Sequence, residues 1–94
     1  MTQTRADMSK DIVAEVGRYC RMFRYLVLEK TVRDVANNSF SSEKTLSNFE
    51  HGRANNIAHL VAYALACDTE EQRLEFYRGI DDVFNKFVGV DNNE

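Results

Sequence analysis

The chain has 94 residues, of which 44% are hydrophobic, so it suits one domain with a modest core and not an intrinsically disordered polypeptide. No stretch approaches the roughly 18 consecutive apolar residues that a membrane span requires, and the polar first residues contain no apolar signal region, so we expect a cytoplasmic protein that does not contact a membrane. The formal net charge is −3, yet residues 5–53 carry nine basic and seven acidic side chains and residues 54–94 carry three basic and eight acidic ones, so the first part remains able to face phosphate groups.

The segment 12–23 has hydrophobic residues at steps of three and four, which predicts an amphipathic helix. Ser9 precedes this segment and is the candidate N-cap. Arg18, Arg21 and Arg24 fall three residues apart and form a basic stripe beside the apolar one. An ordinary solvated helix face is the default interpretation of this stripe.

A short helix is predicted next. Thr31 and Asp34 have the spacing of a capping box, with Asp in place of the usual Glu or Gln, and they open a helix that runs through Ala36. The polar residues 37–39 then favour a turn, because their side chains compete for the hydrogen bonds of the backbone.

The following helix has Ser41 or Ser42 as its N-cap and ends at Gly52. Leu46 lies ten positions after Ala36. A helix-turn-helix needs a small residue where its two helices cross and an apolar residue on the inner side of the second helix. This spacing therefore predicts a helix-turn-helix.

Two further helices complete the prediction. The fourth begins after Asn55 or Asn56, and residues 69–72 form a capping box that opens the fifth. The predicted apolar face of the fourth helix consists of Ile57, Leu60, Val61, Ala64 and Leu65. The predicted apolar face of the fifth helix consists of Phe76, Ile80, Val83, Phe84 and Phe87.

The residue types that carry chemistry are sparse. Cys20 and Cys67 lie in apolar helical segments, where buried free thiols are the favoured interpretation and a disulfide or a redox role is the alternative. His51 and His59 have no ligand-like neighbours, so we expect no metal. No nucleophile–base pair, glycine-rich phosphate loop or carboxylate dyad is present, and we expect neither catalysis nor a cofactor.

Residues 31–53 (TVRDVANNSFSSEKTLSNFEHGR) resemble the Cro/CI-type, or XRE, family of helix-turn-helix DNA-binding proteins, which have the lambda-repressor-like fold. The typical run of the family is a Thr-Gln-x-x-Leu-Ala helix, a turn that contains glycine, and then Ser-x-x-Thr-Ile-Ser-x-Ile-Glu-x-Gly. Ten residues match it without a gap: Thr31, Val35, Ala36, Ser42, Thr45, Leu46, Ser47, Phe49, Glu50 and Gly52. The resemblance covers residues 12–67. It implies a lambda-repressor-like helix-turn-helix core at 9–67. With the aromatic-rich C-terminal helix predicted at 69–88, the expected fold is an all-α, five-helix single domain over 1–94.

Three positions of the motif bear on the expected fold and contacts. Phe40 stands where the turn of the family usually has glycine, and we expect a rebuilt turn with Phe40 folded into the core. Val32 stands where the family usually has a Gln that contacts DNA, so that contact is not expected here. The resemblance also implies a semi-buried ion pair between Glu50 and either Arg21 or Arg24.

The resemblance further implies which residues meet DNA. The groove-facing positions are Ser42, Glu43, Lys44, Ser47 and Asn48, and the expected phosphate partners are Arg33 and Arg53. Lys44 would donate to guanine or to phosphate, Asn48 would pair with adenine, and Glu43 would accept from cytosine or repel phosphate. For each residue the alternative is an exposed polar side chain that makes no contact with DNA.

The fifth helix raises the question of assembly. Tyr77, Phe84, Phe87 and Val88 form a candidate homodimer interface, with closure of the core of the monomer as the alternative. Helix-turn-helix proteins usually bind DNA as dimers.

We therefore predict a sequence-specific double-stranded DNA-binding transcriptional regulator, a small phage- or mobile-element-type repressor, and not an enzyme. The alternative is a module with a helix-turn-helix fold that binds and modulates another regulatory protein without binding DNA. The overall acidity, Glu43 and Val32 are the features that favour this alternative.

Overall fold

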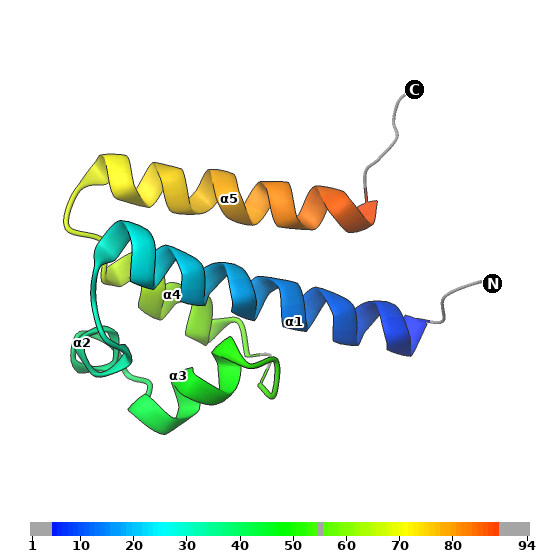
Figure 1. Cartoon of the computed structure of the whole chain (residues 1–94), viewed down its shortest axis with the longest axis horizontal. Helices are drawn as coiled ribbons and strands as arrows, with labels where there is room; N and C mark the ends of the chain where they lie inside the picture. Colours follow the sequence, from blue (N-terminus) through cyan, green and yellow to red (C-terminus); the bar gives the residue numbers. More distant parts are fainter. Residues whose placement is uncertain (1–4, 55, 89–94) are drawn as a thin grey trace.

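The computed structural model describes residues 5–54 and 56–88, and every regular element within these ranges is helical (Figure 1). The elements are α1 (Arg5–Phe23), the π-helical segment η1 (Arg24–Leu28), α2 (Val32–Asn37), α3 (Glu43–Glu50), α4 (Ala58–Leu65) and α5 (Glu70–Val88). The predicted all-α class with five helices is confirmed. Within the described part of the chain, no helix has both the length and the apolar character needed to cross a bilayer.

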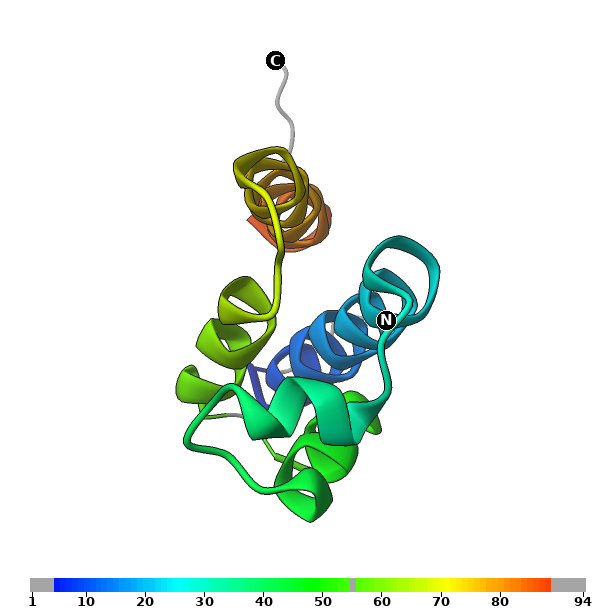
Figure 2. The ribbon, with the colours of Figure 1, turned by 90° about the vertical axis from the view of Figure 1, so that its left-hand side faces the viewer.

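The two long helices, α1 and α5, lie side by side and run in opposite directions (Figure 1). The short helices α2 and α3 pack against each other, and α3 also packs against α1. Figure 2 shows α5 at one end of the molecule and α3 at the other, with α1 and α4 between them. The surface of α3 is therefore far from the surface of α5.

The first helix is longer than predicted. It begins at Arg5, so Ser9 lies inside the helix and is not its N-cap. Helical backbone continues past Phe23 as η1, and Glu29, the residue after η1, has the left-handed conformation with φ of 53°. The backbone N–H of Glu29 donates to the carbonyl oxygen of Arg24 and closes this wide last turn.

Gly17 lets α1 and α3 approach closely. A methyl group in place of its hydrogen would collide with the backbone carbonyl oxygen of Phe49 and press on the carbonyl group of Glu50. Because these atoms belong to the backbone of α3, no side-chain rotation would relieve the collision. The absence of a side chain at Gly17 therefore sets the distance between the two helices.

The predicted caps of α2 and α3 are confirmed. The hydroxyl oxygen of Thr31 accepts from the Asp34 N–H at 3.1 Å, and the carboxylate of Asp34 accepts from the Thr31 N–H at 3.1 Å. Of the two serine candidates, Ser42 is the N-cap of α3, since its hydroxyl oxygen accepts from the Thr45 N–H at 3.1 Å. Gly52 ends the α3 region with φ of 78°, as its sequence position predicts.

The prediction that Phe40 folds into the core is wrong, because 67% of its surface is exposed. Phe40 also has no positive φ. The turn is instead held by Ser39, whose N–H donates to the Ala36 carbonyl oxygen and whose hydroxyl oxygen accepts from the Ser41 N–H at 3.1 Å. The neighbour that turns inward is Ser41, half-buried with its hydroxyl 3.3 Å from Nδ1 of His59.

The predicted apolar face of α4 is wrong in part: Leu60 and Ala64 are half-buried against the core, but Ile57, Val61 and Leu65 are exposed. The buried residues of this helix are His59, Ala62 and Tyr63, whereas Val61 is 44% exposed and Leu65 55% exposed. Tyr63 is fully buried because its hydroxyl has a polar partner inside the core, as described below. The opposite, purely aliphatic side of α4 is left at the surface.

The start of α4 agrees with one of the two predicted caps. The side-chain oxygen of Asn56 accepts from the Ala58 N–H at 2.9 Å. The backbone geometry makes Ile57 the N-cap of α4, so the side chain that caps the helix belongs to the residue before it. The other candidate, Asn55, lies outside the described residues.

At the start of α5 the predicted capping box is only half formed. The hydroxyl oxygen of Thr69 accepts from the Gln72 N–H at 3.1 Å, but the side chain of Gln72 accepts from the N–H of Asp68 and not of Thr69. On the predicted apolar face of α5, Phe76 and Val83 are buried. The remaining members of that face are half-buried (Ile80 and Phe87) or 42% exposed (Phe84).

Candidate nucleic-acid interface

The inner side of α3 is fixed in the core. Leu46 is fully buried and Phe49 is 3% exposed, and the ring of Phe49 contacts the rings of His59 and Tyr63. These contacts fix the rotation of α3 about its own axis. The residues at the remaining positions of the helix must therefore face outward.

Glu50 ties α3 to two other parts of the chain. Its carboxylate accepts two hydrogen bonds from the guanidinium of Arg24, at 2.8 and 3.0 Å, and a third from the Tyr63 hydroxyl at 2.6 Å. The expected ion pair of Glu50 is confirmed with Arg24, one of the two candidates. The hydrogen bond to Glu50 raises the pKa of Arg24, and burial raises the pKa of Tyr63.

The predicted groove-facing residues Lys44, Ser47 and Asn48 lie on the outer side of α3. Lys44 is exposed, and Ser47 and Asn48 are half-buried. Among the described residues, none of these three side chains forms a hydrogen bond or an ion pair with another part of the protein. Their polar groups are thus available to an external partner.

Arg53, a predicted phosphate partner, lies directly beyond α3 and is exposed. Its backbone N–H donates to the carbonyl oxygen of Asn48 at 2.8 Å, which holds it next to the end of the helix. The structure therefore brings Arg53 close to the outward residues of α3 by a backbone contact, while its side chain stays in solvent.

The predicted residues Arg33, Ser42 and Glu43 are engaged within the protein. Arg33 and Glu43 form an ion pair at 3.4 Å, and their side chains are 74% and 54% exposed, so the pair contributes little to stability. The hydroxyl of Ser42 caps α3 and also lies 2.8 Å from the hydroxyl of Thr45. The role of Ser42 that the structure shows is capping.

His51 belongs to the outward surface, although the sequence suggested no contact for it. It is exposed, and its Nδ1 donates to the Ser47 carbonyl oxygen at 2.8 Å, which orients the ring beside Ser47. The spacing of four residues from Ser47 is the signal that places it on the same face.

The cysteines are buried free thiols, as predicted. Burial raises the pKa of the Cys20 thiol and of the Cys67 thiol, which keeps both protonated. Within the described ranges, no group of three or more His, Cys, Asp or Glu side chains is arranged to hold a metal ion.

Comparison with known proteins gives no relative: no family model, no curated protein and no solved structure matches this chain.

Proposed function

We propose that the protein is a sequence-specific double-stranded DNA-binding transcriptional regulator of the helix-turn-helix type. In this proposal α2 supports α3, and α3 enters the major groove. The observation that carries the proposal is the division of α3 into two sides. Its inner side is locked by Leu46, Phe49 and Glu50, and its outer side presents Lys44, Ser47 and Asn48 without an internal partner.

The distribution of charge supports the same face. α5 carries five exposed acidic residues (Glu70, Glu71, Glu75, Asp81 and Asp82) and three basic ones (Arg73, Arg78 and Lys86), which gives it a net charge of −2. Figure 2 shows α5 at the far end of the molecule from α3. Much of the negative charge that makes the chain acidic overall is therefore remote from the surface that would approach phosphate.

Each outward residue has a role in the proposal. Lys44 donates to a guanine edge or to a phosphate, and Asn48 pairs with an adenine edge. Arg53 binds phosphate beyond the end of the helix and so fixes the register of α3 without reading a base. Arg33 binds phosphate only when Glu43 releases it.

The first test is selection of bound fragments from a random duplex pool, followed by titration of the selected duplex at several salt concentrations. Affinity should fall steeply as salt rises, because bound cations are released from the phosphates. Lys44→Ala and Asn48→Ala should change the preferred sequence, each at a cost of about 1–3 kcal/mol on the selected duplex.

A pair of arginine variants provides the matched control. Arg53→Ala should weaken binding to every duplex alike. Arg78→Ala removes another exposed arginine, on α5, and should leave duplex binding unchanged. A folded protein that selects no duplex, or whose binding ignores salt, contradicts the proposal and favours the alternative module that binds another regulator.

We also propose that the DNA-binding form is a homodimer that pairs through α5. Phe84 and Val88, near the end of α5, are 42% and 80% exposed, which leaves apolar surface for a second copy. Tyr77, a third predicted interface residue, is 52% exposed but lies two turns earlier on α5 and stays outside this contact. Phe87, also predicted at this interface, is half-buried against the core of its own chain and offers less. Sedimentation should show a dimer that Phe84→Glu dissociates, and a monomer at high concentration contradicts the pairing.

A further inference from the structure

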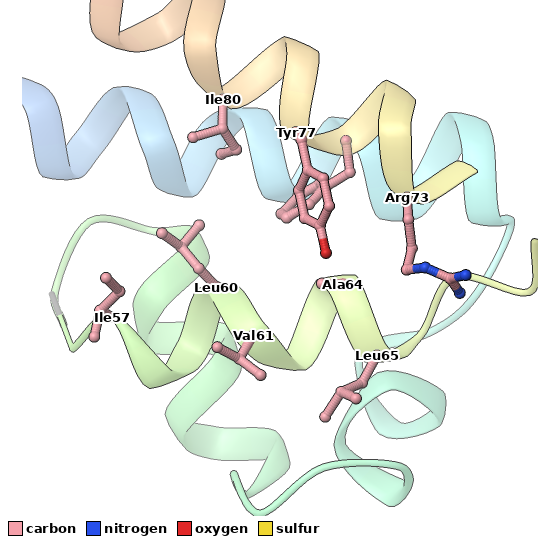
Figure 3. A pocket seen from close by; sticks show the side chains of 9 residues that line it. Ile57, Leu60, Val61, Ala64, Leu65, Arg73, Tyr77 and Ile80 are labelled. Atoms are coloured by element: carbon pink, nitrogen blue, oxygen red, sulfur yellow. The ribbon is translucent and has the colours of Figure 1, made fainter. Parts of the chain in front are cut away.

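An apolar groove of about 420 Å³ lies between α4 and α5 (Figure 3). Its α4 side includes Leu60, Val61 and Leu65, and its α5 side includes Tyr77 and Ile80. The volume is within the range of about 300–1,000 Å³ that is typical of small-molecule sites. The groove exists because α4 buries Tyr63 and leaves its aliphatic side exposed, and because α5 packs mainly against α1.

The groove has a polar end. The side chains of Arg73 and Tyr77, four residues apart on α5, both extend toward α4 in Figure 3. Arg73 is half-buried, and within the described residues neither its guanidinium nor the Tyr77 hydroxyl has a hydrogen-bonding partner. These two groups supply hydrogen-bond donors beside a surface that is otherwise hydrocarbon.

The polar groups between α4 and α5 are bound by Lys30 and not by Arg73. The ammonium of Lys30 donates to the carbonyl oxygen of Ala66 at 2.6 Å, just beyond the end of α4. It also pairs with the carboxylate of Asp68 at 2.9 Å, in the loop between α4 and α5. The Arg73 guanidinium is thus partly removed from water and still unpaired, which strengthens its attraction for an anion.

The opposite end of the groove is apolar and continues into a second hollow. This hollow, of about 190 Å³, shares Ile57 and Leu60 with the groove and extends to Phe84. From Leu65 to Ile57 the α4 side spans about 12 Å, at a rise of roughly 1.5 Å per residue. The polar donors and the hydrocarbon surface are thus arranged one after the other along one path.

We infer that this groove is a binding site for a small amphipathic carboxylate, a carboxylate group joined to an unbranched apolar chain. The carboxylate accepts hydrogen bonds from the guanidinium of Arg73 and the hydroxyl of Tyr77, and the chain lies along Leu60 and Val61 toward Ile57. Lys44, Ser47 and Asn48, the outward residues of α3, do not line the groove, and the inference does not depend on DNA binding.

The test is titration of the full chain with decanoate below its micelle concentration, followed by calorimetry and by amide chemical shifts. Decylamine, which has the same tail and the opposite charge, is the ligand control. Arg73→Gln keeps the shape of the side chain and removes its charge, and Tyr77→Phe removes the second donor from an exposed position. Arg78→Gln is the matched control, an exposed arginine of the same helix outside the groove.

Decanoate should bind with chemical shifts concentrated at Ala64, Leu65 and Tyr77, and decylamine should bind at least about tenfold more weakly. Arg73→Gln should lose about tenfold or more in affinity, and Arg78→Gln should match the wild type. Equal binding of both ligands, unchanged binding by Arg73→Gln, or shifts elsewhere would overturn the inference. It would also be overturned if decanoate failed to bind because a second copy of the chain covered the groove, seen as a dimer that Val61→Glu dissociates.

Discussion

The hydroxyl of Tyr63 on α4 donates a hydrogen bond of 2.6 Å to the carboxylate of Glu50 on α3, inside the core. The same carboxylate oxygen accepts from Nε of Arg24 at 2.8 Å. Arg24 also donates to the carbonyl oxygen of Lys30 at 2.9 Å, just before α2. One buried carboxylate thus connects the segments that precede and follow the proposed DNA-reading helix.

Loss of this carboxylate should destabilise the protein more than loss of any one of its partners. Glu50→Ala leaves the buried donors of Arg24 and Tyr63 unpaired, and we expect a cost of about 3–5 kcal/mol in the free energy of unfolding. Tyr63→Phe removes one charge-assisted hydrogen bond and should cost about 1.5–3 kcal/mol. Urea unfolding measures both. Arg33→Ala, in an exposed ion pair, should stay within about 0.5 kcal/mol of the wild type, and a Tyr63→Phe variant as stable as the wild type would contradict this account.

Gly17→Ala should separate α1 from α3. The added methyl group meets backbone atoms of Phe49 and Glu50, so we expect a loss of about 1–3 kcal/mol in stability and weaker binding to the selected duplex. Thermal unfolding and duplex titration are the measurements. The matched variant Gly79→Ala meets Tyr19 instead of α3 and should retain duplex affinity while folded. Equal duplex affinity of Gly17→Ala and the wild type would show that the spacing of these helices is irrelevant to binding.

Glu43→Gln should strengthen binding to DNA. The substitution removes a negative charge from the first turn of α3 and frees the guanidinium of Arg33, which lies 3.4 Å from the Glu43 carboxylate. Affinity for any duplex should rise, and the dependence of affinity on salt should steepen by about one phosphate contact. If affinity falls on one particular sequence only, Glu43 reads a cytosine there instead of repelling phosphate.

The stability of the fold should decline at alkaline pH through Tyr19. Its hydroxyl donates to the carbonyl oxygens of Glu75 and Phe76, and burial raises its pKa to about 12 from an unfolded value of about 10. The folded state therefore holds this proton more tightly. The contribution is fully present below about pH 10 and is lost as the pH rises toward about 12, because unfolding then releases the proton.

Urea midpoints measured across this pH range check the expectation. The curve of Tyr19→Phe should fall less steeply than that of the wild type above about pH 10, while the two should run parallel below it. Tyr63 and Cys20 also have raised pKa values, so some decline remains in the variant. If the urea midpoints of Tyr19→Phe and the wild type stay parallel across the whole pH range, Tyr19 does not cause the alkaline loss of stability.

The features of this fold that depend on neighbours in the sequence were predictable. The caps by Thr31 and Ser42 and the end of the α3 region at Gly52 follow from local hydrogen bonding and backbone geometry. The ion pair of Glu50 was predicted through the resemblance, and only the packing of α1 decides that its partner is Arg24. The residues on the outward side of α3 were predictable as well, because Leu46 and Phe49 recur at the helical spacing of one buried face.

The face of α4 was not predictable in the same way. Hydrophobicity alone favours burial of Ile57, Val61 and Leu65, but the core selects the side that carries Tyr63 and His59, because their polar atoms reach Glu50 and Ser41. These partners lie 13 and 18 positions away in the chain.

The turn at Phe40 was mispredicted for a related reason. The hydroxyl of Ser39 accepts from the Ser41 N–H and holds the turn, so no glycine is needed there. The ring of Phe40 is left exposed to solvent.

α5, at the opposite end from α3, carries a net charge of −2, so the charge of the molecule is unevenly distributed along its length. In the field of a highly charged polymer such a body experiences a torque before any contact is made. Its angular orientation is then selected during the approach, and the encounter rate, more than the lifetime of the complex, becomes sensitive to the ionic atmosphere.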